Sequence, residues 1–489
     1  SFERFSRLPL KRVLRCQSLK AIKMTSSDPV ARAIGLEGYA TNTTGIGGVL
    51  KARVSDFRVD EISTSISFDS RGRFTVARIT LTNWETNKFC NNLAKRLGIS
   101  RNRIFFAGTK DKRAVTQQIF IIDATQHKVA QIDMPDVEIE ILGRTHQKIG
   151  FGNHRGNRFT IVVRGCCHPD GTPMTEDEAL AEAELIKNEL RQNLGEGIFP
   201  NWIGPQRFGS GRPVTAEVGK HVLAGNFQQA VLTYLSMEGF DENLEVAGFR
   251  KHVRDNGVTA EGLELAPKWL GFESRMIEHL LNNQDDYVGA FKKLPNNLQL
   301  MTIHAAQSII FNQSLNRRIS SGLPISTPIE GDLVGRIDEK GQLNVNSCVT
   351  VESRTLPRIT RNCQLGRLVT TGPLPGSEIY VAGGKSREIE LSAISESGLA
   401  EIDWNIEQIP RLSSKGTRRA LVSNFNDLYI DSVPIAIPES LGERWNAGPN
   451  ENSRWHPEGA CIRFRFSLSS GSYATTLLRE FMQCPLNQL

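Results

Sequence analysis

The sequence lacks an uninterrupted apolar run of about 18 residues, the length at which a segment becomes a candidate membrane-spanning helix. It is also poor in cysteine, with eight in 489 residues and no Cys-x-x-Cys pair. This usage argues against a secreted disulfide scaffold and favours a reducing compartment. Cys166, Cys167 and His168 are adjacent and cannot easily share one tetrahedral metal ion, so we expect no metal site.

Outside its first 26 residues the chain has no surplus of charge of either sign. The formal net charge is +6, and residues 1–26 account for all of it with seven basic residues and one acid. The remainder holds 52 basic and 52 acidic residues, so net charge alone does not indicate a nucleic-acid-binding body. The basic, Ser-containing segment has the composition of an organelle transit peptide, and an upstream stretch before a start at Met24 is the alternative.

The chain is long enough for two to four domains with a large core. Strand and helix patterns are interspersed without a βαβ alternation, which favours an α+β fold. We expect strands at residues 45–62, 74–81, 104–107, 118–122, 158–164 and 462–468, and helices at residues 83–97, 175–195 and 298–319. Residues 216–297 are mostly helical in pattern, and residues 323–409 read as strands and turns.

Basic side chains are segregated although the body is neutral. Residues 95–113 hold seven basic residues and one acid, and residues 144–164 hold five basic residues and no acid. Such clusters are often no more than solvated faces, but aromatic and glycine residues are interleaved in the second one, as in surfaces that bind RNA bases and phosphates.

The single acid of the first cluster is Asp111. It follows an apolar strand and a glycine turn, and Lys110, Lys112 and Arg113 flank it. Nearby positive charge favours an ionised carboxylate, which is what a nucleophile or base needs and also what an ordinary surface ion pair contains.

At Asp111 the sequence resembles the TruD family of pseudouridine synthases. The stretch Gly-Thr-Lys-Asp-Lys-Arg-Ala-Val-Thr-Gln-Gln at residues 108–118 is similar to the family signature, and five more stretches agree in order. These are residues 45–51 with 56–59, residues 156–159, residues 200–209, residues 306–315, and residues 469–475 with Arg479 and Glu480. Two details depart from the family pattern: Val54-Ser55 stands where Pro-Glu is usual, and Trp202-Ile203 where Tyr-Phe is usual.

The resemblance implies a V-shaped α+β protein with a basic cleft. A catalytic domain with a central mixed or antiparallel sheet would comprise residues 45–198 and 413–489, and a family-specific α+β insertion domain would comprise residues 199–412. Residues 1–44 would form a basic N-terminal tail.

The resemblance also implies the reaction, in which the N1–C1′ bond of a uridine in RNA, mainly tRNA, is broken and the base rejoined through C5. No cofactor, metal or energy source is required, and the protein would act as a monomer away from membranes, in the cytoplasm or nucleus, or in a mitochondrion or plastid if the tail is a transit peptide. By motif position Asp111 would be the catalytic carboxylate, attacking C1′ or deprotonating the sugar, and both routes remain open. Lys51 would pair with Asp111, and Asn157 would position the aspartate or the base. The expected substrate-binding residues are Phe159, Lys110, Lys112, Arg113, Arg155, Arg158, Gln206 and Arg207; for Phe159 a plain core position, and for Gln206 and Arg207 a structural role, are the alternatives.

A non-catalytic RNA-binding protein or RNA-folding chaperone on the same scaffold is the second interpretation. It predicts that replacing Asp111 leaves the biological effect unchanged. A methyltransferase is disfavoured, because the glycines at residues 45–48 lie within strand sequence and those at 383–384 lack the spacing of a phosphate-binding loop.

Overall fold

The computed structural model describes residues 28–209, 211–240, 242–338, 341–378, 380–434 and 458–489. The basic segment of residues 1–26 and its transit-peptide interpretation lie outside these residues. Within them, no helix is both long enough and apolar enough to cross a membrane.

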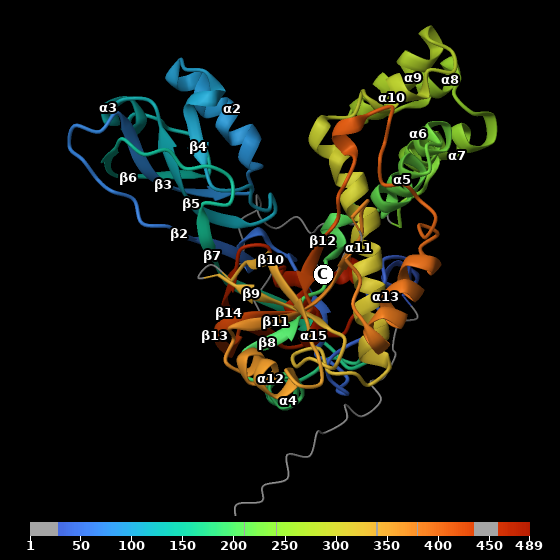
Figure 1. Cartoon of the computed structure of the whole chain (residues 1–489). Coiled ribbons are helices and arrows are strands. Elements are labelled where there is room, and N and C mark those ends of the chain that lie inside the picture. Colours follow the sequence, from blue (N-terminus) through green and yellow to red (C-terminus); the bar gives the residue numbers. More distant parts are fainter. Residues whose placement is uncertain (1–27, 210, 241, 339–340, 379, 435–457) are drawn as a thin grey trace, which may run out of the picture.

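A mixed sheet forms the centre of the molecule (Figure 1). Ten strands of the described chain build it in the order β6-β3-β5-β2-β7-β14-β13-β8, with β1 paired to β7 and β4 to β5. In the described pairings of this sheet all neighbours are antiparallel except β2 and β5, which confirms the expected mixed character. The strands are β1 (Gly47–Val49), β2 (Phe57–Ser63), β3 (Phe74–Thr82), β4 (Ile104–Phe106), β5 (Val115–Ile122), β6 (Val137–Thr145), β7 (His154–Cys166), β8 (Ile198–Pro200), β13 (Val422–Val433) and β14 (Cys461–Ser469).

Two helices of this part begin and end at signals that are visible in the sequence. In α2 (Thr86–Leu97) the apolar side chains pack into a core with β3 and β5, and Gly98 ends the helix in the left-handed conformation that its lack of a Cβ allows. In α4 (Glu176–Leu194) Thr175 and Glu178 form the expected reciprocal capping box. The remaining helices of this part are α1 (Pro29–Ala33), α3 (Gln126–Ala130) and α15 (Ala474–Met482).

The middle of the chain forms a helical arm and a second sheet. The helices are α5 (Val214–Leu223), α6 (Phe227–Ser236), α7 (Leu244–Asn256), α8 (Ala260–Leu265), α9 (Gly271–Asn282), α10 (Tyr287–Phe291) and the long α11 (Asn296–Ser320). The second sheet has the order β10-β9-β11-β12, from β9 (Leu333–Ile337), β10 (Leu343–Thr350), β11 (Leu368–Leu374) and β12 (Thr417–Ala420).

Two helices interrupt the region that was expected to contain only strands and turns, so that expectation was wrong in part. They are α12 (Leu356–Gln364) and α13 (Gly384–Glu396). The buried face of α13 carries Ser386 and Glu390 beside Ala393 and Ile394, and Glu390 pairs with the buried Arg418. Because polar residues occupy this face, the apolar spacing that identifies a helix in a sequence is absent.

Residues 28–44, placed by the sequence interpretation in the N-terminal tail, pack against α15. Arg479 donates hydrogen bonds to the main-chain oxygens of Leu36 and Gly38, and the Ala40 amide donates to Glu480. In Figure 1 the lobe with α2, α3, β3 and β6 and the arm with α5 to α10 extend from the central region on opposite sides. The domain boundaries, the V shape and the basic cleft stay predictions.

Candidate active site

Asp111 lies in the loop of residues 107–114 that joins β4 to β5. The two strands pair from Ile104 with Ile122 to Phe106 with Phe120, so the loop emerges at one end of a short hairpin. Hydrogen bonds from outside the hairpin hold it: the Lys110 amide donates to Thr86 Oγ1, and the Gly152 amide donates to the Ala107 oxygen. The part of the loop that precedes Asp111 is therefore fixed, while the Asp111 side chain keeps 42% of its surface exposed.

Lys51 reaches Asp111 from the loop after β1, as expected from the sequence. Its Nζ lies 3.0 Å from Asp111 Oδ2 and 4.4 Å from the centre of the Phe57 ring. The ammonium group is therefore held between a carboxylate and an aromatic face, both of which favour a positive charge. Within the described residues the Oδ1 atom of Asp111 makes no hydrogen bond, and the side chain as a whole is 42% exposed.

The backbone of Lys51 has a left-handed conformation, with φ of 53°. Such a conformation is costly for a residue with a side chain and persists only where its surroundings impose it. Arg113 supplies part of that constraint, because its Nε donates to the Lys51 oxygen at 2.8 Å and its Nη2 to the Ala52 oxygen at 2.7 Å. Arg113 thus ties the loop of Asp111 to the loop of Lys51.

One face of the central sheet lies beside this ion pair. Glu61 of β2 is directly across from Asn157 of β7, and the Phe57 ring meets the Phe159 ring edge to face at 6.3 Å. The Phe159 ring also stacks on Phe466 at 5.3 Å, and only 7% of this residue is exposed. In the described part of the chain the buried Oδ1 of Asn157 makes no hydrogen bond, so it is an unsatisfied acceptor.

Lys110 points away from solvent although a phosphate contact was expected for it. Its Nζ lies 3.0 Å from Glu61 Oε2, and the two side chains are 5% and 1% exposed. An ion pair buried this deeply holds the loop onto β2. The expected phosphate contact of Lys110 stays a prediction with no support in this geometry.

The remaining expected substrate-binding residues occupy three places. Lys112 is exposed beside Asp111. Arg155 and Arg158 are exposed on β7, where strand alternation puts Arg158 on the face opposite Asn157 and Phe159. Gln206 and Arg207 contact the start of α15, through Thr475 Oγ1 at 3.3 Å and the Tyr473 hydroxyl at 3.5 Å. The structure thus brings Lys51, Asp111 and Phe159 together around Phe57, and it places Asn157 across from Glu61, the partner of Lys110. Gln206 and Arg207 contact the start of α15 instead.

Sequence reasoning assigned no role to Phe57 and Glu61, although a signal for them exists. Both lie on the inward-facing alternation of β2, and Phe57 belongs to a stretch that carries the family resemblance. Phe151 is a further aromatic residue of the site: it is 71% exposed, its ring lies 5.4 Å from that of Phe106, and the following amide is the one bound to Ala107. In the described part of the chain no group of three His, Cys, Asp or Glu side chains is arranged to hold a metal ion.

An exposed carboxylate fixed by a lysine, above a sheet face with aromatic and amide side chains, fits the class of pseudouridine synthases, enzymes that isomerise uridine within RNA. The family model described as tRNA pseudouridine synthase D (TruD) matches residues 33–481. The chain belongs to the TruD family of pseudouridine synthases.

Relatives and a solved structure agree with this assignment. A protein of Methanosarcina mazei named "Probable tRNA pseudouridine synthase D" is 37% identical over 455 residues, which cover 93% of this chain and 97% of that protein. A protein of the same name from Halobacterium salinarum is 32% identical over 476 residues, covering 94% and 99%. A crystal structure of the Methanosarcina mazei TruD protein superimposes with a TM-score of 0.77 at 35% identity, covering 95% of this chain and all of that one.

Proposed function

We propose that this chain converts a uridine of tRNA to pseudouridine and that Asp111 is its catalytic carboxylate. The observation that carries the proposal is the Lys51–Asp111 ion pair on an exposed, braced loop. The lysine orients the carboxylate, and the exposed Asp111 side chain can reach a ribose that is presented from solvent.

The reaction is an isomerisation in which atoms and electrons balance without a co-reactant. The N1–C1′ bond breaks and its electron pair leaves with the uracil, while Asp111 either bonds to C1′ or takes a proton from the sugar. The base rotates, C5 bonds to C1′, the hydrogen on C5 leaves as a proton, and N1 gains a proton. In the first route the Asp111–C1′ bond breaks again, and in the second Asp111 returns its proton.

The uridine must leave its stack before Asp111 can reach it, at a cost of a few kcal/mol. The unpartnered Oδ1 of Asn157 is suited to accept a hydrogen bond from an N–H of the extracted uracil. The exposed ring of Phe151 is suited to stack on a neighbouring base, because the hydrogen bond from Gly152 to Ala107 and the contact with the Phe106 ring hold it next to the loop of Asp111.

The deciding experiment compares Asp111→Asn with the wild-type chain on tRNA transcripts under single-turnover conditions, with pseudouridine read by mass spectrometry. We expect no product from Asp111→Asn, while binding of the tRNA is retained. The control is Asp255→Asn, which removes an exposed carboxylate of α7. Product formation by Asp111→Asn at the wild-type rate would refute the mechanism. An unchanged biological effect of Asp111→Asn in cells would favour the RNA-folding chaperone interpretation instead.

The specific uridine, the oligomeric state and the compartment are separate parts of the proposal. We propose a monomer, which light scattering of the purified chain tests. Mapping pseudouridines in RNA from cells with and without the protein identifies the target. A fluorescent fusion of about the first 40 residues tests organelle targeting, and a diffuse signal would reject the transit peptide.

A further inference from the structure

Arg419 of β12 is a guanidinium surrounded by neutral oxygens. Its Nε donates to the main-chain oxygen of Asn201 at 3.3 Å, and its Nη2 donates to Asn201 Oδ1 at 2.5 Å and to the Gly471 oxygen at 3.3 Å. Within the described residues no carboxylate lies within ion-pair distance of it, and its Nη1 makes no hydrogen bond. Burial lowers the pKa of Arg419 to about 10, because the charged form loses solvation that no acid replaces.

A second arginine, Arg207, lies close enough to act on the first. Its Nη2 is 3.5 Å from the hydroxyl of Tyr473, the residue before α15, and the described chain places no carboxylate at ion-pair distance from this side chain either. Its positive charge adds to the lowering of the Arg419 pKa, and together with burial it lowers the pKa of His304 on α11. Arg207 and Arg419 therefore both contact the segment of residues 471–473, and within the described chain neither has a carboxylate at ion-pair distance.

Other buried arginines of this protein show how unusual the arrangement is. Five of them have a carboxylate within 4.0 Å, as expected for a charge removed from water: Arg164 with Asp56, Arg250 with Glu242, Arg318 with Asp332, Arg418 with Glu390 and Arg479 with Glu480. Arg418, the neighbour of Arg419 in the chain, is compensated, so the absence of an acid at Arg419 is a property of this place and not of the strand.

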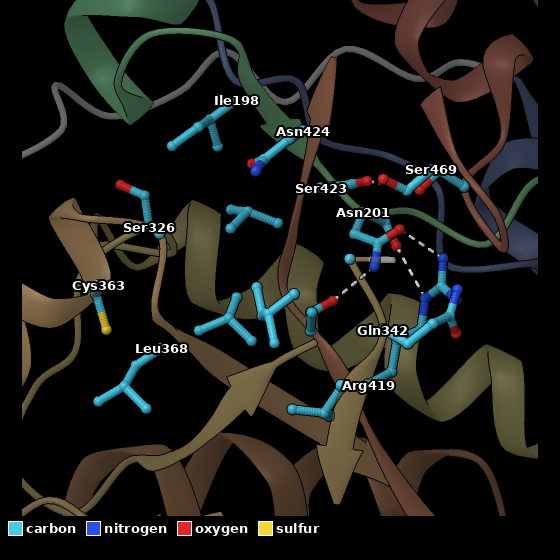
Figure 2. Close-up of a pocket in the computed structure, with 18 of the residues that line it drawn as sticks. Ile198, Asn201, Ser326, Gln342, Cys363, Leu368, Arg419, Ser423, Asn424 and Ser469 are labelled. Atoms are coloured by element: carbon cyan, nitrogen blue, oxygen red, sulfur yellow. Dashed lines mark hydrogen bonds between the residues drawn. The ribbon is translucent and has the colours of Figure 1, made fainter. Parts of the chain in front are cut away.

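A cavity of about 480 Å³ adjoins Arg419 (Figure 2). Its rim includes Asn201, Gln342 and the turn of residues 469–472, which contains three serines and a glycine. Gln342 donates to the Ser470 oxygen at 2.7 Å, and the hydroxyls of Ser423 and Ser472 are 2.6 Å apart, so the second sheet and the central sheet brace the turn from two sides. The cavity lining combines these neutral polar groups with apolar side chains, and it also contains Glu196, whose side chain is 82% exposed.

The same turn directly continues a strand of the active site. In β14, Phe466 lies across from Phe159 and Leu468 across from Asn157. Gly471 follows Leu468 by three residues, which spans at most about 10 Å of chain. An RNA whose uridine lies against Asn157 would therefore bring its flanking backbone to Arg419 and Arg207.

We propose that Arg207 and Arg419 bind a backbone phosphate of the RNA that flanks the reacting uridine. This inference rests on the proposed function, since it takes RNA as the ligand. A phosphodiester supplies the missing negative charge, and the free Nη1 edge of Arg419 offers the planar donors that phosphate oxygens accept. The contact fixes the position of the RNA without reading its sequence.

The test measures binding of labelled tRNA to the full chain over a range of salt concentrations. We expect Arg207→Gln to weaken binding about tenfold and to lower the slope of log K against log salt by about one, equally for different tRNAs. Arg419→Lys keeps the positive charge but loses the planar guanidinium, so it should weaken binding less than Arg207→Gln does. The control is Arg354→Gln, because Arg354 is 83% exposed and already paired with Glu352.

Neutral methylphosphonate substitutions along the RNA locate the contact. We expect one position near the uridine at which a methylphosphonate in the RNA weakens binding to the wild-type chain. At that position the same methylphosphonate should not weaken binding to the Arg207→Gln chain any further. A further measurement compares inorganic phosphate with chloride at equal ionic strength as competitors of tRNA binding. If inorganic phosphate competes only at tens of millimolar, the site takes a phosphate that belongs to RNA and not free phosphate. A folded Arg207→Gln chain with unchanged affinity and slope would overturn the proposal. The readout is binding, so it stays valid whether or not Asp111→Asn makes pseudouridine.

Discussion

Lys51 Nζ and Asp111 Oδ2 are 3.0 Å apart although 60 residues separate them in the chain. Three further contacts make this distance a property of the fold: the ring of Phe57 under the ammonium group, and the two hydrogen bonds from Arg113 to the main chain at Lys51 and Ala52. Asp111, the proposed catalytic carboxylate, and its partner Lys51 are thus positioned by a network that also includes Arg113.

Replacing Lys51 with Met should lower the single-turnover rate about 10- to 100-fold, because the carboxylate loses the group that orients it. Affinity for tRNA should change less than about threefold, since Lys51 is occupied by Asp111 and not by a phosphate. Lys415→Met is the control, because Lys415 is 80% exposed and pairs with Glu378, which is not part of the candidate active site. A loss confined to tRNA affinity would contradict the assignment.

Replacing Arg113 with Gln separates its observed role from the phosphate contact expected from the sequence. Two main-chain oxygens lose their donors, so we expect a loss of about 2 kcal/mol in the free energy of unfolding and a fall in the rate at saturating tRNA. The salt dependence of binding should stay near that of the wild-type chain. If the slope falls by about one while the rate at saturation is kept, Arg113 contacts phosphate instead.

Breaking the buried pair of Lys110 and Glu61 should be strongly destabilising. Either Lys110→Met or Glu61→Gln leaves one group without its partner, and we expect a loss of about 3–5 kcal/mol for Lys110→Met, which leaves a buried charge. The double variant should lose less free energy of unfolding than the two single variants lose in sum. Urea unfolding of the wild-type chain, the two single variants and the double variant measures the coupling energy between Lys110 and Glu61. Additive losses in the free energy of unfolding would show that the two side chains do not stabilise each other.

Replacing Phe151 with Ala should weaken tRNA binding about 5- to 20-fold, the amount expected for one lost base-stacking contact. Because the ring is 71% exposed, the free energy of unfolding should change by less than about 1 kcal/mol. Phe240→Ala removes a half-exposed ring of the helical arm and serves as the control. Equal effects of the two substitutions on binding would argue against a specific contact of Phe151.

The ion pairs of Asp123 should make the folded chain less stable in acid. Hydrogen bonds from Arg73, at 2.7 Å, and Arg103, at 3.2 Å, lower the pKa of its carboxyl to about 2. A lowered pKa stabilises the folded state above the unfolded value of about 4, and this contribution is lost as the pH falls from about 4 to about 2. Both arginines are well exposed, so we expect only about 1 kcal/mol at pH 7. The difference in unfolding free energy between the wild-type chain and Asp123→Asn should shrink over that range, and a constant difference would contradict the assignment.

Local sequence determined a large part of the fold and the identity of the central residue. The helix stop at Gly98, the capping box of Thr175 and the alternation of β14 each depend on residues a few positions apart, and the structure confirms all three. Asp111 was located by a contiguous motif and by the segregation of basic residues around it, since both are properties of neighbours in the chain.

The tertiary structure decided which partner each charged side chain takes. The sheet order places β2 between β5 and β7, and this order sends Lys110 to Glu61 and the Arg113 guanidinium to two main-chain oxygens. It also packs Phe159 against Phe466 and leaves Arg419 without a carboxylate. Ion pairs and buried charges join residues tens to hundreds of positions apart, and the sequence pattern carries only the short periods of single strands and helices. The sequence by itself therefore singled out Asp111 as the proposed catalytic carboxylate, and only the folded chain showed that Lys51 pairs with it while Lys110 pairs with Glu61.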